Sequence, residues 1–443
     1  MATRAIAAAV LLASALVAWL TITSTPAARA LQASIILSIL YVGYLAWRGA
    51  AVMRRAVSAS RSGAGEPTGL AGDLPFVSLV LPARDEESVI GTTVRSLRAI
   101  NYADAAGRPA YDVLVVDDGS TDATGERARE AAAGAAHVLS RRRDPGDGSR
   151  TKASVLAFAM PYVRGEVIGV IDADTVVGPA FLEHAMRAWQ RDPGAAALQV
   201  SRRPRNADVS WLTRAQAEEQ LMDMASQCGR RATDGTAELR GNGMFVRRAV
   251  LEDVGGWNLD ALTEDLDLST RLSVAGHHVA LAPEAAVEEE AVETLGALWR
   301  QRLRWAEGSL RRLLEHGPGL LAGRQPLGRK ADFLAFAAEF LLPPLFVTTI
   351  GASLLTIPMP RPADWSVPLT LFAAYGIGVF LLALGGLSAV GVRGWPLLGR
   401  AARGAVFLSH WLIVVPVALA RIAMGAERAG FVKTPRFTGG VDR

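Results

Sequence analysis

Long apolar stretches occupy both ends of the chain, and alternating strand and helix patterns lie between them. Near the N-terminus, Ala5–Ile22 and Leu31–Val52 are each long enough to cross a bilayer, whose apolar core needs about 20 helical residues. Near the C-terminus the same holds for Phe333–Met359, Val367–Val390 and Ala405–Met424. The pattern therefore predicts two transmembrane helices before the middle segment and about three after it.

The first apolar stretch has two interpretations. An Ala-x-Ala sequence at Ala28–Ala30 is typical of a signal-peptide cleavage site. The stretch is nevertheless longer than a usual signal h-region of roughly 7–15 residues, which favours an uncleaved span. In both cases Arg54 and Arg55 follow the second stretch, and the positive-inside rule then places the middle segment in the cytosol.

The middle segment alternates strands with helices. Strands are predicted at Phe76–Pro82, Tyr111–Val116 and Glu166–Ile171, with helices at Ser88–Ile100 and Ala123–Ala133. This alternation indicates a mostly parallel sheet with helices on both faces, in which ligands bind at the carboxyl ends of the strands. Acidic side chains follow each of the three strands, namely Asp85, Asp117, Asp118, Asp172 and Asp174.

These patterns divide the chain into six parts. We expect N-terminal transmembrane helices (1–55), a Gly-, Ser- and Ala-rich linker (56–75), an α/β domain (76–290), amphipathic helices (291–330), C-terminal transmembrane helices (331–424) and a polar tail (425–443). Within the α/β domain, the Arg- and Gly-rich stretch Leu139–Lys152 predicts a mobile loop.

The topology contains one inconsistency. Three full spans after a cytosolic domain would leave the tail outside, whereas Arg428, Lys433 and Arg436 favour the inside. One C-terminal run is therefore expected to be re-entrant or interfacial, and the candidates are Pro343-Pro344 and the amphipathic stretch Trp395–Arg403.

A helix is predicted around Gln301–Trp305. At 100° per residue, Gln301, Arg304 and Trp305 fall on one face. The opposite face is an apolar stripe of Trp299, Leu303, Ala306, Leu310, Leu313 and Leu314. Such a stripe can lie on a bilayer or against a core, and a basic interfacial helix without further function is one interpretation.

Composition changes this picture little. The formal charge is +4 and the mean hydropathy is +0.23. The arginine clusters lie beside the apolar runs, and the interleaved aromatic and basic pattern of a nucleic-acid binder is absent, so no nucleic-acid partner is expected. Cys228 is the single cysteine, which excludes a disulfide framework and a Cys-based metal site.

Two acidic motifs follow predicted strands. Asp172 and Asp174, one residue apart, supply oxygen ligands of the kind that Mg²⁺ or Mn²⁺ takes when it also binds substrate phosphates, although two acids in a surface turn are common. Asp118 lies in Asp117–Ser120, where an acid can hydrogen-bond a base or a ribose. No dinucleotide G-x-G-x-x-G or phosphate-binding P-loop sequence accompanies them.

Two further motifs lie later in the domain. Thr263–Asp265 precedes a predicted helix at Leu266–Ala275, so Thr263 is either an N-cap with acids in the first turn or part of a site. Gly241–Gly243 is either a tight turn or a place where the backbone approaches a ligand closely.

Taken in order, the motifs resemble those of the membrane-embedded family-2 glycosyltransferases, which include cellulose, hyaluronan and poly-N-acetylglucosamine synthases. The matching segments are Pro82–Glu87, Asp117–Ser120, Arg150–Lys152, Asp172–Asp174, Thr263–Asp265 and Gln301–Trp305. Many processive members carry a Cys-bearing motif before the catalytic acid, where this chain has Gly241–Gly243.

The resemblance implies a cytosolic GT-A-like domain, inserted between transmembrane helices, that binds a UDP-sugar and a divalent cation, Mg²⁺ or Mn²⁺. The implied roles are uridine binding by Asp118 with Asp85, nucleotide contact by Lys152, nucleotide and metal binding by Asp172 and Asp174, general base catalysis by Asp265, and diphosphate or acceptor binding by Gln301, Arg304 and Trp305 with Glu264.

Three functions follow as expectations. The leading one is an inverting, processive enzyme of the plasma membrane, multi-pass, that elongates a β-linked polysaccharide and exports it. The alternative is a non-processive enzyme that adds sugar to a lipid acceptor. A scaffold with a degenerate transferase domain is disfavoured by the intact acids at Asp118, Asp172, Asp174 and Asp265. The sugar, the linkage and any accessory subunits are left open.

Overall fold

The computed structural model describes residues 2–61, 74–142, 151–322, 326–357 and 366–426. Most of the predicted linker, most of the Leu139–Lys152 loop and nearly all of the polar tail, including Arg428, Lys433 and Arg436, lie outside these residues. The chain forms two compact units. The helical unit comprises Met1–Arg54, Ser210–Thr236 and Glu293–Gly430, and the sheet unit is built mainly from Arg55–Val209 and Ala237–Val292.

The sheet unit contains a seven-stranded mixed sheet in the order β3-β2-β1-β4-β6-β5-β7. Its strands are β1 (Val77–Ala83), β2 (Tyr111–Asp117), β3 (His137–Ser140), β4 (Val167–Val170), β5 (Ala197–Pro204), β6 (Met244–Arg247) and β7 (Val279–Glu289). Its helices are α3 (Ile90–Arg98), α4 (Thr124–Ala132), α5 (Lys152–Ala159), α6 (Phe181–Gln190), α8 (Arg248–Asp253) and α9 (Glu264–Val274), with a short 3₁₀ turn at Met160–Tyr162.

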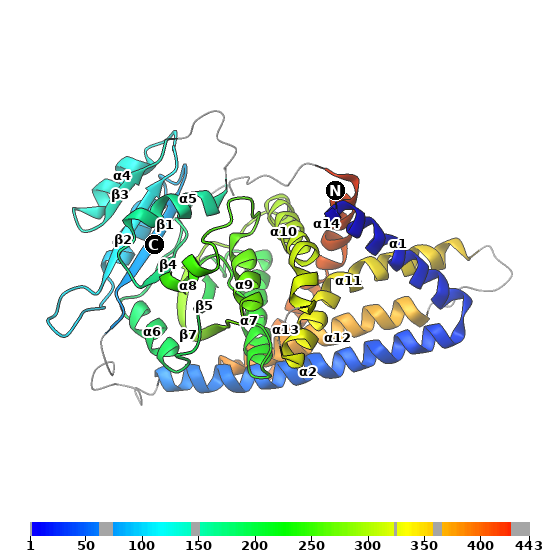
Figure 1. Cartoon of the computed structure of the whole chain (residues 1–443). Helices are drawn as coiled ribbons and strands as arrows, with labels where there is room; N and C mark the ends of the chain where they lie inside the picture. The colour runs from blue at the N-terminus through cyan, green and yellow to red at the C-terminus, as the bar shows by residue number, and fades with distance from the viewer. Residues whose placement is uncertain (1, 62–73, 143–150, 323–325, 358–365, 427–443) are drawn as a thin grey trace. The chain divides into compact units, whose positions relative to one another are not determined.

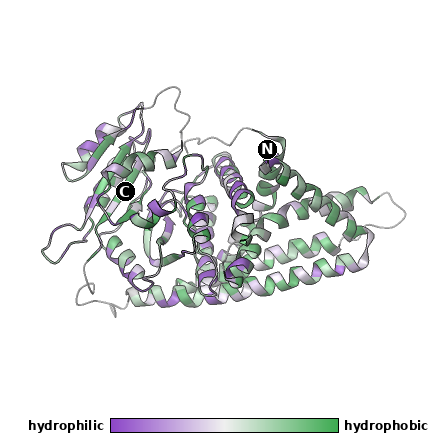
Figure 2. Cartoon of the chain, viewed as in Figure 1, coloured by the Kyte–Doolittle hydropathy of each residue, from purple (hydrophilic) through white to green (hydrophobic). Residues whose placement is uncertain are grey.

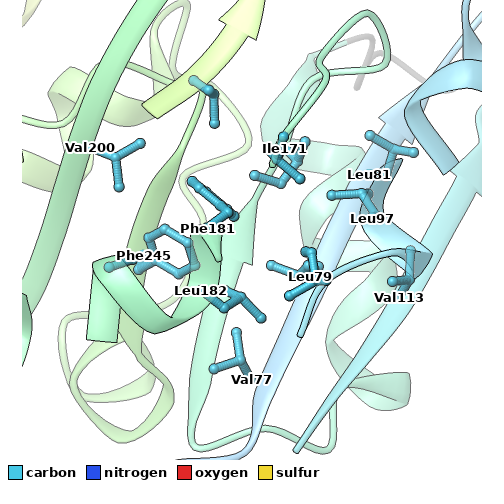
Figure 3. Packing of buried hydrophobic residues seen from close by; sticks show 14 of the residues in the cluster. Val77, Leu79, Leu81, Leu97, Val113, Ile171, Phe181, Leu182, Val200 and Phe245 are labelled. Atoms are coloured by element: carbon cyan, nitrogen blue, oxygen red, sulfur yellow. The ribbon is translucent and has the colours of Figure 1, made fainter. Parts of the chain in front are cut away.

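Both faces of this sheet are buried, because side chains alternate between two apolar cores along each strand. On β1, Leu79 and Leu81 point into a core formed with α3, α4 and α6 (Figure 3), whereas Val80 points into a second core formed with α5, α8 and α9. In the first core, Phe181 of α6 packs against Phe245 of β6, with ring centroids 5.9 Å apart. Such two-sided burial is what near-continuous apolar strand sequences predict.

The predicted mostly parallel α/β sheet is confirmed, with two differences. The strands β3, β5, β6 and β7 were not predicted, and β6 pairs antiparallel with both β4 and β5. β6 is only four residues long, and β3 lies at a sheet edge with little burial. Neither strand therefore carries a periodic pattern long enough to identify it.

The helical unit contains eight helices within the described residues. They are α1 (Ala2–Thr23), the greater part of α2 (Thr25–Arg61), α7 (Trp211–Arg231), α10 (Leu295–Ala322), α11 (Leu327–Leu355), α12 (Ser366–Ala389), α13 (Gly394–Leu408) and α14 (Trp411–Met424) (Figure 1). Apolar residues predominate on α1, α11 and α12, whereas α7 and α10 carry polar and apolar residues together (Figure 2).

Five helical segments among the described residues are long and apolar enough to cross a membrane: Thr3–Thr23, Thr25–Ala59, Leu327–Leu355, Ser366–Ala389 and Gly394–Met424. They overlap the five predicted runs. α11 continues through Pro343 and Pro344 as one helix. The last segment, by contrast, is divided into α13 and α14 at Ser409-His410.

Close backbone packing joins α7 to α2 and α12, although α7 comes from the middle of the predicted α/β domain. A Cβ added at Gly229 of α7 would collide with the carbonyl oxygen of Leu45 in α2, and one at Gly49 of α2 would collide with the carbonyl oxygen of Ala225 in α7. A Cβ at Gly386 of α12 would lie 2.9 Å from a backbone oxygen of α7. Small residues at these crossings let the helix backbones approach closely.

The predicted apolar stripe of α10 packs against other helices. Ala306 and Leu310 are buried with Ala7 of α1 and with Val414 and Leu419 of α14. Several charged side chains of α10 are buried as well, among them Arg302, Glu307 and Arg312. This part of the stripe therefore packs in a core, whereas Trp299 at its start is 41% exposed.

Buried carboxylates in the helical unit are paired with arginines. Asp332 of α11 accepts three hydrogen bonds from the Arg230 guanidinium of α7, at 2.9 to 3.2 Å. Glu218 of α7 is fully buried and accepts hydrogen bonds from Arg400 and Arg403 of α13. Removing one partner of such a pair typically costs about 3–5 kcal/mol, because it leaves an uncompensated buried charge.

We predict that Gly229→Ala destabilises the helical unit by about 1–3 kcal/mol, because its added methyl group meets rigid backbone rather than a flexible side chain. Gly376→Ala on α12 is the matched control, since its Cβ would meet nothing within 4 Å. Alanine should there be neutral or stabilising by up to about 1 kcal/mol. Thermal unfolding of both variants in detergent measures the difference, and equal midpoints would contradict the packing argument.

Candidate active site

The carboxyl ends of β2, β1 and β4 meet at one edge of the sheet, because these three strands are parallel neighbours. Ala83 of β1 lies opposite Asp117 of β2, so the segments that begin with Arg84 and Asp118 leave the sheet side by side. Asp172 and Asp174 follow β4 at the same edge. The strands thus bring together the acids that the sequence placed after them.

Asp85 ties the loop after β1 to the loop after β2. Its backbone is left-handed, with φ of 53°, a conformation that aspartate tolerates better than most residues. One of its carboxylate oxygens accepts hydrogen bonds from the backbone N–H (2.7 Å) and the hydroxyl (3.1 Å) of Thr121. Its own N–H donates to the Ser120 hydroxyl at 3.0 Å. Asp85 therefore holds together the two loops at which the uridine site is predicted.

Asp118 is buried and held by an arginine that the sequence did not single out. Arg141 donates to an Asp118 carboxylate oxygen at 2.7 Å and to the Ser154 hydroxyl at 3.2 Å. Arg141 lies directly after β3, and its N–H donates to the carbonyl of Asp117. The ion pair fixes the orientation of the Asp118 side chain at the strand edge.

Lys152 stands at the centre of an acidic cluster. It is the first residue of α5, and the preceding Thr151 caps this helix by accepting a hydrogen bond from the Ser154 N–H. The Lys152 ammonium donates to Asp172 at 2.5 Å and to the carbonyl of Gly241 at 2.7 Å, and it lies 3.4 Å from Glu264. Asp172 and Glu264, 92 positions apart in the sequence, thus converge on one cation.

This cluster shifts the pKa values of its members. Burial raises the pKa of Glu264 and of Asp265 above the usual carboxyl range, although Lys152 opposes both shifts. Burial works in the opposite direction on Lys152, but Asp172 and Glu264 outweigh it and raise the pKa of the ammonium. Lysine therefore stays charged, whereas the two acids take up protons more readily than exposed ones.

Asn242 is the structural centre of the turn between α7 and β6. Its side-chain oxygen accepts from the Asp172 N–H (3.1 Å), and its amide donates to Thr175 (2.9 Å) and to Glu289 (2.9 Å). The flanking Gly241 has φ of 77°, and a Cβ there would lie 3.1 Å from an Asp265 carboxylate oxygen. Gly241–Gly243 is therefore a tight turn that lies against Asp265, and its close approach to a ligand stays a prediction.

Thr263 occupies the N-cap position of α9, but its side chain makes no capping hydrogen bond. Glu264, Asp265 and Asp267 lie in the first helical turn, where the helix dipole favours negative charge. An Asp265 oxygen accepts from the Leu266 N–H at 2.9 Å. The helix start therefore aims Glu264 and Asp265 at the Lys152 cluster, as a site interpretation of the motif requires.

The acids fit a divalent cation shared with a substrate. Among the described residues, no group of three or more His, Cys, Asp or Glu side chains is arranged to hold a metal by itself. Mg²⁺ is commonly bound by one or two carboxylates together with substrate phosphates, so a dedicated protein cage is not required. The Asp172 side chain is 38% exposed although it contacts Lys152, which leaves it accessible to a second ligand.

Gln301, Arg304 and Trp305 lie on α10 of the helical unit, and their grouping with the acidic cluster stays a prediction. Trp305 is covered by the neighbouring Arg302 guanidinium, 4.2 Å from its ring centroid, and Arg302 is paired with Glu219 of α7. The buried side-chain oxygen of Gln301 accepts no hydrogen bond from the described residues.

Sequence reasoning singled out the Gly241–Gly243 turn without a role for Asn242, and it missed Arg141 and the Arg202–Glu289 ion pair at 2.6 Å, whose Glu289 accepts from Asn242. Asn242 alone could be recognised from the sequence, because its two flanking glycines indicate a turn. Arg141 lies in an arginine-rich run whose members are indistinguishable by pattern.

Comparison with known proteins agrees with this geometry. Residues 75–308 match the family described as glycosyltransferase like family 2. A mannosyltransferase from Pyrobaculum calidifontis, solved in complex with GDP-Man and Mn²⁺, superposes with a TM-score of 0.52 at 21% identity, covering 86% of this chain and 99% of that one. At this identity the structural match supports the fold, and the expected GT-A-like domain is confirmed.

Two curated relatives differ in how much of the chain they match. A β-monoglucosyldiacylglycerol synthase from Synechocystis sp. is 35% identical over 376 residues, covering 83% of this chain and 76% of that protein. A poly-β-1,6-N-acetyl-D-glucosamine synthase from Staphylococcus epidermidis is 26% identical over 239 residues, covering 52% of this chain and 54% of that protein. Because the match to the Synechocystis protein covers 83% of this chain, it includes most of both compact units.

We predict that Gly241→Ala weakens nucleotide-sugar binding or turnover at least tenfold, because its methyl group displaces the Asp265 carboxylate. Gly134→Ala is the matched control: its φ of 79° is equally unfavourable for alanine, at about 1–2 kcal/mol, but its Cβ would meet nothing within 4 Å. Both variants should lose similar stability, while the control keeps normal activity. Equal activities in the two variants would contradict the assigned contact.

Proposed function

The chain is a member of glycosyltransferase family 2, and on this premise we propose that it adds a single hexose from a UDP-hexose to the free hydroxyl of a diacylglycerol. The observation that supports this acceptor is the similarity, over most of the chain, to relatives named β-monoglucosyldiacylglycerol synthase. The match to polysaccharide synthases covers about half of the chain. Lipid glycosylation, the alternative in the sequence analysis, is therefore better supported than polymer synthesis.

A membrane location follows from this acceptor. Diacylglycerol stays in the bilayer, so the enzyme must bring its donor site to the membrane surface. The apolar helices at both ends of the chain are long enough to anchor it there. We propose a multi-pass protein of the plasma membrane with the sheet unit in the cytosol, where UDP-sugars are made and where Arg54 and Arg55 favour that side.

The transfer inverts the configuration of the anomeric carbon in this proposal. The acceptor hydroxyl oxygen attacks that carbon, the bond to the diphosphate oxygen breaks, and Asp265 takes the hydroxyl proton. One carboxylate base is enough, because the leaving diphosphate needs no protonation by an acid, unlike the leaving group of inverting glycosidases. The raised pKa of Asp265 suits this role, since a stronger base takes a proton more readily.

The other charged groups hold the donor. We propose that Asp118 and Asp85 bind the uridine, and that Asp172 and Asp174 hold a divalent cation together with the diphosphate. When bound, such a cation supplies positive charge that stabilises the diphosphate as it leaves. Lys152 is placed beside Asp172 and Glu264, where its charge opposes their repulsion of the donor phosphates. Gln301, Arg304 and Trp305 are proposed to contact the diphosphate and the acceptor.

The acceptor is tested by incubating the purified protein with UDP-glucose or other UDP-sugars, Mg²⁺ or Mn²⁺, and diacylglycerol. We expect a lipid carrying one sugar of inverted anomeric configuration, identified by mass spectrometry and linkage analysis. Asp265→Asn should bind UDP with normal affinity but lose transfer by about 10²–10⁴-fold. A long polymer formed without lipid would replace this proposal with processive synthesis.

The base assignment predicts a specific pH dependence. Because burial raises the pKa of Asp265, the acid limb of kcat should lie above the pH range near 3.9 that is ordinary for aspartate. Lys152→Met removes a charge that lowers this pKa, so the limb should move to higher pH, whereas Lys152→Arg keeps the charge and should leave it near its original position. The limb midpoint is measured, which separates this effect from any loss of rate. An unmoved limb in Lys152→Met would refute the base assignment.

A further inference from the structure

The last apolar run of the chain consists of two short helices. α13 and α14 contain 15 and 14 residues, about 22 and 21 Å at 1.5 Å per residue, whereas the apolar core of a bilayer is about 30 Å thick. The helices α1, α2, α11 and α12 contain 22, 37, 29 and 24 residues and exceed this thickness. Length therefore separates α13 and α14 from the other four apolar helices.

The four long helices run as two hairpins whose returning ends meet α7. Leu45 and Gly49, in the second half of α2, are packed against α7. Gly386, near the end of α12, approaches α7 as well. The opposite end of this bundle is formed by the start of α2 and the start of α12, since Ala28 and Val367 share one apolar cluster. α7 therefore marks the end of the bundle at which α2 leaves it.

Both ends of α14 reach elements at the α7 end of the bundle. At its start, the Trp411 indole donates to Glu219 of α7 at 3.4 Å. Near its other end, Arg421 lies 3.8 Å from Glu307 of α10, and the carbonyl of Met424 accepts from Arg4 at the start of α1 at 3.3 Å. A helix that crossed the membrane would carry its two ends to opposite faces. Figure 1 shows α14 at one end of the bundle formed by α1, α2, α11 and α12.

α13 has the side-chain distribution of an interfacial helix. Its polar face is fixed to α7 through Arg400 and Arg403, which both bind Glu218. On another face, Trp395, Leu398 and Val406 are 85%, 42% and 64% exposed. Amphipathic helices with this arrangement lie in the membrane plane, with apolar and tryptophan side chains at the boundary between headgroups and acyl chains.

We propose that α13 and α14 form a lipid-contacting layer that lies in the membrane surface at the end of the bundle where α2 leaves it, and that neither helix crosses the bilayer. The partner of this surface is the lipid boundary itself, contacted through Trp395, Leu398 and Val406 of α13 and Ile413 of α14, which is 60% exposed. The chain then crosses the membrane four times, and its tail begins on the side where α2 ends.

The charges of the tail agree with this topology. Arg428, Lys433 and Arg436 conflict with five crossings, because the positive-inside rule would then be broken at the C-terminus. Four crossings remove the conflict without a re-entrant segment at Pro343 and Pro344, through which α11 continues as one helix. The inference is independent of the acceptor proposed above.

Sidedness is tested with single cysteines in a Cys228→Ala background and a maleimide that does not cross membranes. Thr25→Cys reports the turn between α1 and α2, Ala105→Cys an exposed loop of the sheet unit, and Ala426→Cys the start of the tail. In sealed right-side-out vesicles we expect labelling of Thr25→Cys only. Ala105→Cys and Ala426→Cys should react after detergent is added. Labelling of Ala426→Cys together with Thr25→Cys would overturn the proposal.

Depth is tested with fluorophores attached at Val406→Cys and Ile413→Cys, and with lipids brominated at shallow or deep acyl positions. A single crossing helix over Gly394–Met424 would place both positions near the bilayer centre, so deep bromines would quench most. A surface layer predicts that shallow bromines quench most. Ile377→Cys on α12, which is also exposed, is the crossing control and should be quenched most by deep bromines. Deep quenching at all three positions would refute the layer.

Discussion

A carboxylate removed from water must be compensated by positive charge or hydrogen-bond donors, and this requirement organises both units of the molecule. In the helical unit each buried carboxylate has several donors: Glu218 forms ion pairs with two arginines, and Asp332 accepts three hydrogen bonds from Arg230. In the sheet unit one ammonium, that of Lys152, lies among Asp172, Glu264 and Asp265. The first arrangement holds helices together, while the second leaves two acids whose pKa values are raised.

Sequence pattern was most informative where a residue's position is decided locally. Asp85, Asp118 and Asp172 each lie one or two residues after a buried strand, so the parallel topology brings them to one edge. The sequence could not reveal that Arg141 pairs with Asp118, because one arginine among several looks like any other. Nor could it reveal that α7 joins the helical unit, because that depends on backbone contacts at Gly49 and Gly229 which only the packed helices create.

The motifs placed polymer synthesis before lipid glycosylation, whereas the relatives support lipid glycosylation better. The difference has a physical reason. In the proposed reaction, Asp265 takes the proton and the Asp172–Asp174 pair holds the donor, and both steps are common to polymer and lipid glycosylation. None of the six short segments identifies an acceptor. The similarity to the relative named β-monoglucosyldiacylglycerol synthase covers 83% of this chain, whereas the six short segments report only on the chemistry that both reactions share.

The close contact of α7 with α2 has a consequence for biosynthesis. About 150 residues separate the end of α2 from the start of α7, which takes a ribosome about 8 to 30 s at typical rates of roughly 5–20 residues per second. During this interval α2 has been synthesised, but α7, against which it packs, has not. α12, which also packs against α7, is synthesised later still. The small residues of α2 therefore contact lipid or the insertion machinery during this interval. The helical unit reaches its final packing only after the whole sheet unit has been synthesised.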